Sequence, residues 1–99
     1  MAIDAIVVNE ADNVATALRE LKAGEEALFR RHRELGRTTL KEDIPYGHKF
    51  ALRSVRRGQE ILKYGEVIGR ATKDIVAGGH AHVQNIESLR GRGDLWKEP

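Results

Sequence analysis

The sequence predicts a small, mainly β protein, an irregular all-β domain with one or two short helical turns. Two observations support this fold class. Short segments rich in β-branched or alternating residues recur along the chain. Most of them follow a turn that ends in glycine. The chain has 99 residues, which fits one compact domain with a modest core.

The turns share the pattern polar, apolar, any, any, glycine, and each copy stands before a segment able to form a strand. The polar residue can start a tight turn, the apolar residue can enter the core, and glycine can adopt the positive φ that closes the turn. The spacing of the copies is uneven and only the turn recurs, so they do not indicate a solenoid repeat. The four copies are residues 20–24, 43–47, 54–58 and 74–78.

Between the turns lie the expected strands, which are short and alternating or β-branched. They cover residues 3–8, 13–18, 48–52, 60–63, 67–71 and 80–86. Residues 25–35 consist largely of good helix formers, and Gly24 and Gly36 flank them. We therefore expect the short helical turns in this region.

Composition indicates a soluble, folded chain, because hydrophobic residues make up 40% of it and charged residues 32%. There is no cysteine, which excludes disulfides and thiolate sites and favours a cytoplasmic location. No basic leader with an apolar segment is evident. No apolar run approaches the roughly 20 residues that span a bilayer. We expect neither export nor membrane insertion.

The charge balance argues against nucleic acid as a partner. Seventeen Lys and Arg against fifteen Asp and Glu leave a net charge of +2. The one cationic cluster, residues 30–33, has glutamates close by, whereas nucleic-acid surfaces concentrate their cations. A small anionic ligand needs only two or three cations and remains compatible.

The chain divides into a domain over residues 1–87 and a tail over residues 88–99. The tail carries two glycines and a proline among charged residues, together with Leu95 and Trp96. One reading is a frayed terminus. The other is a partner-docking segment, since exposed tryptophan is enriched in interface hot spots.

Three segments concentrate side chains that core packing does not require: residues 46–49, 63–65 and 80–85. On a strand, His80, His82 and Gln84 would share one face. Two imidazoles at this spacing could chelate a metal or bind an anion, although solvated histidines are common and no third ligand is evident.

The first two of these segments also allow more than one reading. His48 could act as a general acid or base, or could be a hydrogen-bonding turn residue beside Gly47. On a strand that begins there, His48 and Lys49 would point to opposite faces. Lys63 could pair with a substrate carboxylate, or could be a solvated lysine that balances a neighbouring glutamate.

These segments resemble the N-terminal SAF domain of altronate and galactarate dehydratases and the small subunit of sulfolactate sulfo-lyase. The similarity extends over residues 9–86, and several separate runs in family order are more specific than any single motif. The matching runs are Asp12-Asn13-Val14-Ala15, Gly47-His48-Lys49-Phe50-Ala51-Leu52, Lys63-Tyr64-Gly65, Ile68-Gly69 and His80-Ala81-His82.

The resemblance implies a SAF-type β-clip fold and a reaction that removes water from a polyhydroxy acid to give a 2-keto-3-deoxy acid. Such an elimination needs a base, a cation that stabilises the enolate, and an acid for the departing hydroxide. A divalent metal, iron or manganese, is also implied. The residues assigned are His48, Lys49, Lys63 and His82 for catalysis, His80 and His82 for metal, and Asn13, Tyr64, Gln84 and Asn85 for substrate binding.

The chain departs from the family pattern in two ways. Asn9 and Gln84 stand where the family often has histidine, and asparagine and glutamine are poor metal ligands that cannot act as bases. The large second region of full dehydratases is also missing from these 99 residues.

The missing large region implies a large catalytic dehydratase subunit as the partner of this chain. An anionic sugar acid is the implied substrate. Association of further copies of the chain is also compatible with this reading. Two alternatives stay open. The chain could be a non-catalytic SAF binding module. It could instead be the small subunit of a sulfolactate-type sulfo-lyase, in which sulfite leaves in place of water.

Overall fold

The computed structural model describes residues 2–31 and 33–88. Within them it contains strands and no helix, which confirms the mainly β class. The strands are short, as the small core requires. They are β1 (Ala5–Ile6), β2 (Val14–Ala17), β3 (Glu26–Arg31), β4 (Glu34–Thr39), β5 (Lys49–Ala51), β6 (Glu60–Lys63), β7 (Glu66–Ala71), β8 (His80–Ala81) and β9 (Ile86–Ser88).

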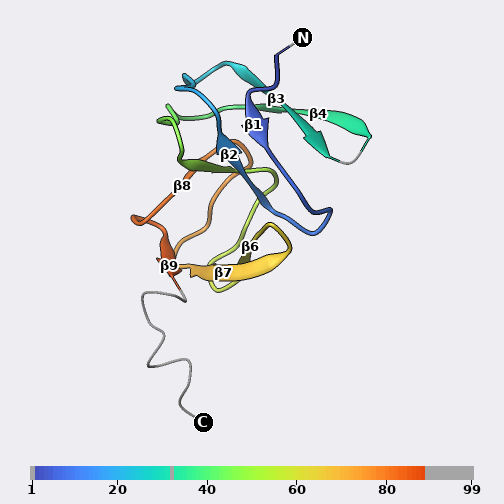
Figure 1. The fold of residues 1–99 in the computed structure, drawn as a ribbon. Helices are drawn as coiled ribbons and strands as arrows, with labels where there is room; N and C mark the ends of the chain where they lie inside the picture. The colour runs from blue at the N-terminus through green and yellow to red at the C-terminus, as the bar shows by residue number, and fades with distance from the viewer. Residues whose placement is uncertain (1, 32, 89–99) are drawn as a thin grey trace.

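The strands form two sheets, which occupy different ends of the molecule in Figure 1. The larger sheet has the order β4-β3-β1-β2-β5-β8, and the smaller has the order β6-β7-β9. Strands β1 and β3 pair in parallel, and the other pairs are antiparallel. The candidate functional site lies beside β5, the β6–β7 hairpin and the segment that joins β8 to β9.

The helical turns expected in residues 25–35 are wrong, because this segment belongs to the β3–β4 hairpin. The hairpin pairs from Glu26↔Thr39 to Arg31↔Glu34. A helix of about eleven residues is marginal in water, whereas the hairpin buries Leu28 and Phe29. Gly36 leaves room for the Phe29 ring, which an added Cβ at this position would displace. Tertiary packing therefore overrides the local helix propensity.

The strand expected over residues 80–86 is interrupted. β8 ends at Ala81 and β9 begins at Ile86, and a turn occupies residues 82–85. His80, His82 and Gln84 therefore do not line one face of a single strand. The other expected strands are present. Each of their observed ends lies within two residues of the predicted end.

The four glycine turns form as predicted. Their glycines, Gly24, Gly47, Gly58 and Gly78, have φ values between 82° and 93°. The four apolar residues of the turns are buried and pair across the structure: Leu21 bridges Ile44, and Val55 bridges Ile75. Each turn thus fixes both a chain reversal and a core position.

The two pairs of turns are built alike, so the fold contains an internal correspondence. Leu21 and Ile44 exchange two backbone hydrogen bonds of 2.9 and 2.8 Å, and Val55 and Ile75 exchange two of 2.8 and 2.7 Å. In each pair an aspartate of the second turn accepts a bond from a backbone amide of the first: Asp43 from Ala23 at 2.9 Å, and Asp74 from Arg57 at 2.8 Å. The segments 17–26 and 51–60 also both begin Ala-Leu-Arg.

Each pair of turns has its own core. One buried cluster contains Leu21, Ile44 and Phe50 together with residues of β1, β2 and β3. The second contains Val55 and Ile75 with residues of β6, β7 and β8. Since β2 and β5 contribute to both clusters, the two cores are joined through these strands.

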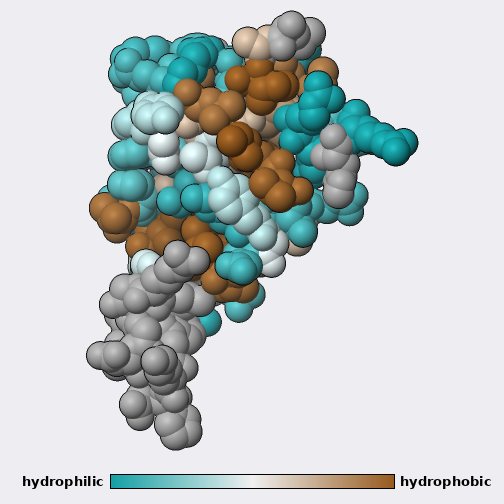
Figure 2. All heavy atoms as spheres, in the orientation of Figure 1, coloured by the Kyte–Doolittle hydropathy of each residue, from teal (hydrophilic) through white to brown (hydrophobic). Residues whose placement is uncertain are grey.

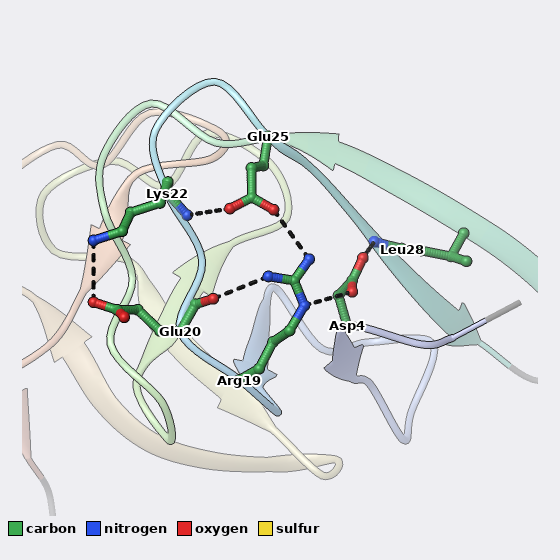
Figure 3. A network of polar contacts seen from close by, with 6 residues as sticks. All are labelled: Asp4, Arg19, Glu20, Lys22, Glu25 and Leu28. Carbon is green, nitrogen blue, oxygen red and sulfur yellow. Dashed lines mark hydrogen bonds and ion pairs between the residues drawn. The ribbon is translucent and has the colours of Figure 1, made fainter.

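Figure 3 shows the polar network that ties the first turn to β1 and β3. The Arg19 guanidinium binds Asp4 at 3.1 Å and Glu25 at 3.0 Å. The same two carboxylates accept backbone hydrogen bonds, Asp4 from Leu28 at 2.9 Å and Glu25 from Lys22 at 2.7 Å. Because exposed ion pairs contribute at most about 1 kcal/mol, the network mainly fixes the geometry of this end.

Hydrophobic side chains also remain on the surface. Figure 2 shows a hydrophobic band that follows the course of β1 across the upper half of the molecule. Ile6 and Val8 are 38% and 55% exposed.

In the described residues, no helix is long and apolar enough to cross a membrane. The predicted tail over residues 88–99 lies mostly outside the described residues: Ser88 belongs to β9, and residues 89–99, which include Trp96, are not described.

Candidate functional site

A cavity of about 410 Å³ lies between β5, the β6–β7 hairpin and the β8–β9 segment. It gathers three of the four side chains that the sequence assigns to catalysis, together with Tyr64. Its wall combines charged and apolar groups. The lining residues are Lys49, Lys63, Tyr64, Glu66, Ile68, His82, Val83, Ile86 and Ser88.

Beside the cavity, three imidazoles form a stack. The ring of His48 lies 3.8 Å from the ring of His82 and 5.1 Å from that of His80, measured between centroids, with interplanar angles of 17° and 11°. One nitrogen from each ring lies within 4.8 Å of the others. The residue that could complete a metal site, which the sequence does not reveal, is therefore His48.

Strand pairing explains why these histidines meet. β5 and β8 are antiparallel, with Phe50 opposite His80 and Lys49 opposite Ala81. His48 immediately precedes β5 and His80 begins β8, so the pairing sets them near each other across the sheet. The sequence carries one relevant signal, since both histidines come shortly after the glycine that ends a turn, His48 directly after Gly47 and His80 two residues after Gly78.

Hydrogen bonds fix the orientation of the His80 ring. The side-chain nitrogen of Gln84 lies 3.2 Å from His80 Nδ1 and 3.4 Å from the His80 carbonyl oxygen. The Nε2 atom of His80 lies 2.9 Å from Nδ1 of His48. This contact needs one proton between the two nitrogens, carried by either ring according to its tautomer, and an ion held by both rings would take the place of that proton.

Asn85 shapes the turn that carries His82. Its side-chain oxygen accepts from the His82 amide at 2.9 Å, and its side-chain nitrogen donates to the His80 carbonyl at 2.8 Å. Gln84 and Asn85 thus position the two histidines from within their own turn. Their assignment to substrate binding stays a prediction.

The donor set fits a metal ion. The Nδ1 atom of His82 is buried and has no hydrogen-bond partner within the described part of the chain, so this nitrogen is left for another ligand. Neutral imidazole is the usual histidine form that binds iron, manganese or zinc. His48, His80 and His82 are the residues that would hold such an ion.

The electrostatic environment favours neutral histidines. Burial lowers the pKa of His80, and the charge of His48 lowers it further, although Glu42 opposes this. Burial, followed by the nearby His48 and Lys49, also lowers the pKa of His82. The pKa of Lys49 is lowered by burial and then by Lys63. The site therefore disfavours accumulated positive charge and would gain from an anion.

Asn13 lies in a different environment from the other assigned residues. Its side chain is 5% exposed. Its nitrogen donates to the Glu60 carbonyl at 2.9 Å, and its oxygen accepts from the Leu62 amide at 2.8 Å. These bonds attach the start of β2 to β6. The geometry favours a structural role for Asn13 over substrate binding.

Two further residues at the site were not assigned from the sequence. Glu66 lines the cavity and stands opposite Lys63 in the β6–β7 register. Asn9, which occupies a frequent histidine position of the family, packs against Gly65, where an added Cβ would lie 2.9 Å from its side-chain nitrogen. Only the fold brings Asn9 to the Lys63-Tyr64-Gly65 run.

The short strands, the two sheets and the cavity are those of a small all-β domain. A family model described as the altronate/galactarate dehydratase SAF domain matches residues 3–89. The chain belongs to this family.

The chain is similar to several characterised proteins. It is 41% identical over 83 residues to the altronate dehydratase of Escherichia coli (strain K12) and, to the same extent, to that of Bacillus subtilis (strain 168). Each alignment covers 84% of this chain but 16% of the dehydratase. The chain thus spans about a sixth of the length of these relatives.

A smaller relative matches over much of its own length. The chain is 44% identical over 54 residues to (2R)-sulfolactate sulfo-lyase subunit alpha of Paracoccus pantotrophus. This alignment covers 54% of the chain and 81% of that subunit. The chain is thus similar both to a part of the dehydratases and to most of a smaller lyase subunit.

Proposed function

We propose that this chain supplies part of the active site of a sugar-acid dehydratase of the altronate/galactarate type, as a small subunit or as an N-terminal domain. The enzyme would remove water from an aldonate or aldarate to give a 2-keto-3-deoxy acid. The observation that carries the proposal is the meeting of Lys49, Lys63 and His82 on one cavity, beside two further imidazoles.

The two lysines are suited to bind the substrate carboxylate. Both line the cavity, and they are near enough for Lys63 to lower the pKa of Lys49. A carboxylate between them would relieve this repulsion and gain charge-assisted hydrogen bonds, each worth about 1.5–3 kcal/mol. The same contacts would stabilise negative charge that develops on the carboxylate as the α-proton leaves.

The histidines are suited to move protons. In the elimination, the α-carbon loses a proton to a base, its electron pair forms the carbon–carbon double bond, and the β-hydroxyl leaves as water after accepting a proton. His82 lines the cavity, and its lowered pKa favours the neutral form that can accept the α-proton. His48, stacked on His82, is the second candidate for proton transfer.

A divalent ion, iron or manganese, is proposed as the cofactor, and His48, His80 and His82 are the residues that would hold it. A ring that ligates the ion has no free lone pair to accept the α-proton, so His82 or His48 would act as the base only while that ring is not a ligand. When bound, the ion would act as a Lewis acid on a substrate oxygen. The chain contributes the ligand orientation, because Gln84 binds the His80 ring and Asn85 fixes the backbone of the turn. Such supporting contacts commonly determine metal affinity.

A large catalytic dehydratase subunit is proposed as the partner. The alignment with altronate dehydratases covers 16% of their length, so most of a complete dehydratase has no counterpart in these residues. Pockets for small molecules commonly form between domains, and Tyr64 and Val83 on the cavity wall are exposed. Assembly of further copies of this chain within the complex is compatible with the proposal.

A sulfo-lyase subunit is the second candidate. It is favoured by the match to 81% of the sulfolactate sulfo-lyase alpha subunit. The same α-proton abstraction would serve, with sulfite as the leaving group. Assays with altronate, galactarate and sulfolactate on one preparation separate the two candidates.

The test is purification of the tagged chain from its native cells, followed by mass spectrometry and assays for 2-keto acid and sulfite. A stoichiometric large partner together with release of 2-keto acid from altronate or galactarate supports the dehydratase. His82→Ala should abolish this activity while the circular dichroism spectrum is retained, and Lys73→Ala serves as an exposed control. A chain that is recovered alone and inactive would favour a non-catalytic binding module.

A further inference from the structure

The tip of the β6–β7 hairpin has an unusual backbone. Lys63 and Glu66 are paired, and Tyr64 and Gly65 form the two-residue loop between them. The φ angles of Tyr64 and Gly65 are 55° and 77°, as in a type I′ hairpin turn. Asparagine, aspartate or glycine is favoured at the first position of this turn. Tyrosine there is strained, because its Cβ disfavours positive φ.

Burial of the ring does not account for this tyrosine. Its side chain is large, yet the residue is 46% exposed. Tyr64 is also the only residue other than glycine with positive φ among the described residues. Strained backbone that persists at an exposed position is typical of functional sites.

The buried carboxylate of Asp12 holds the strained loop. Asp12 is 1% exposed, and its Oδ2 and Oδ1 atoms accept from the amides of Tyr64 and Gly65 at 3.0 and 2.8 Å. The same carboxylate accepts from the amides of Val8 and Asn9 at 3.3 and 3.1 Å. It therefore joins the hairpin tip to the loop before β2, which lies 52 positions earlier in the chain.

This arrangement places the tyrosine ring against a cavity lysine. Lys63 Nζ lies 5.0 Å from the centroid of the Tyr64 ring, within the range of a cation–π contact. Both residues line the cavity. The ring therefore restricts the Lys63 ammonium, whose flexible stem would otherwise sample many rotamers.

We propose that Tyr64 is a positioning residue of the cavity, which orients Lys63 for ligand binding, and that Asp12 keeps the strained backbone of Tyr64 in place. The Tyr64 ring directs the Lys63 ammonium toward a carboxylate ligand. This inference rests on the proposed binding of a sugar acid in the same cavity. It explains why the turn contains a tyrosine where asparagine would form the turn more easily.

Replacement of Tyr64 by asparagine tests the proposal, because stability and binding should change in opposite directions. Asparagine tolerates positive φ, so Tyr64→Asn should keep or raise the urea midpoint. Binding of galactarate, followed by amide shifts in nuclear magnetic resonance spectra, should weaken by about threefold to fivefold, the value of a cation–π contact at an exposed site. Tyr64→Phe keeps the ring and should bind almost as the parent does.

Tyr46→Asn is the matched control, since Tyr46 is an exposed turn tyrosine outside the cavity lining; it should leave galactarate binding unchanged. Asp12→Asn should lower both the urea midpoint and galactarate binding, because an amide nitrogen cannot accept the bonds that one carboxylate oxygen now accepts. The role of Tyr64 is overturned if Tyr64→Asn binds galactarate as well as the parent while Lys63→Met does not. If the parent chain shows no galactarate shifts at cavity residues, either alone or with the large partner added, both this inference and the proposed sugar-acid site are overturned.

Discussion

The Nδ1 atom of His48 lies 2.9 Å from the Nε2 atom of His80, although the two residues are 32 positions apart in the chain. Each histidine follows a glycine-ended turn, and the two turns occupy equivalent places in their own turn pairs. Pairing of β5 with β8 brings them together. The internal correspondence of the fold thus builds the centre of the candidate site.

This histidine cluster should bind a divalent metal through all three rings. Replacement of His48, His80 or His82 by alanine should each weaken Mn²⁺ binding by at least about tenfold, since even supporting residues of metal sites contribute tenfold or more. Titration of the EDTA-treated protein, with free Mn²⁺ followed by electron paramagnetic resonance, measures this change. Lys73→Ala is a control for an exposed substitution. A Mn²⁺ affinity equal to that of the parent in all three histidine variants would contradict the metal site.

Lys49 and Lys63 should both contribute to anion binding. Lys49→Met and Lys63→Met keep much of the side-chain length but remove the charge, and each should weaken galactarate binding by about tenfold, equivalent to about 1.4 kcal/mol. Calorimetric titration gives the affinities. Lys73→Met removes the same charge from an exposed residue outside the cavity and should have little effect. If all three variants weaken binding alike, the lysines act only through net charge.

Asn13 should contribute to stability more than to ligand binding. Asn13→Ala leaves the Leu62 amide and the Glu60 carbonyl without their side-chain partners. The loss should lower the free energy of unfolding by about 1–3 kcal/mol, measured by urea denaturation. Galactarate affinity of the folded variant should stay near that of the parent. Unchanged stability with lost binding would instead support the substrate-binding assignment.

Stability should fall as the solution is acidified from neutral pH. In the folded chain the pKa values of His80 and His82 lie below their ordinary value of 6.5. Between those lowered values and 6.5, the unfolded chain binds more protons than the folded chain, so protonation favours unfolding. The urea midpoint of the EDTA-treated protein should therefore decrease between about pH 7 and about pH 5.

A variant with both His80→Asn and His82→Asn should show a smaller decrease over the same pH range. Both substitutions remove the titrating rings but keep polar side chains. A pH dependence equal to that of the parent would show that other groups control acid stability.

The class of fold was predictable from the sequence because its strongest signals are local. A turn that ends in glycine needs only five residues, and all four predicted turns have positive φ at their glycine and a buried apolar residue. The same dependence on local signals explains why the prediction of helical turns in residues 25–35 was wrong. Good helix formers predict helix, but the partner strand and the ring of Phe29 over Gly36 favour a hairpin.

The candidate site was predictable only as separate segments. The sequence singles out His48, Lys49, Lys63 and the His80–His82 run, but strand periodicity could not show that a turn follows Ala81. It also could not show that His48 stacks on His82. Nor does the sequence show whether the side-chain amide of Asn13 binds a ligand or binds the backbone of β6, as it does in the structure.

The sequence by itself determined the turns, the strand-rich class and the residue types available for chemistry, because these depend on neighbours along the chain. The tertiary structure decided which residues share a cavity, which histidine completes the cluster, and that Asp12 holds the strained Tyr64 loop. These relationships depend on strand pairing over long separations. Pairing is set by the packing of the whole core, which no local pattern encodes.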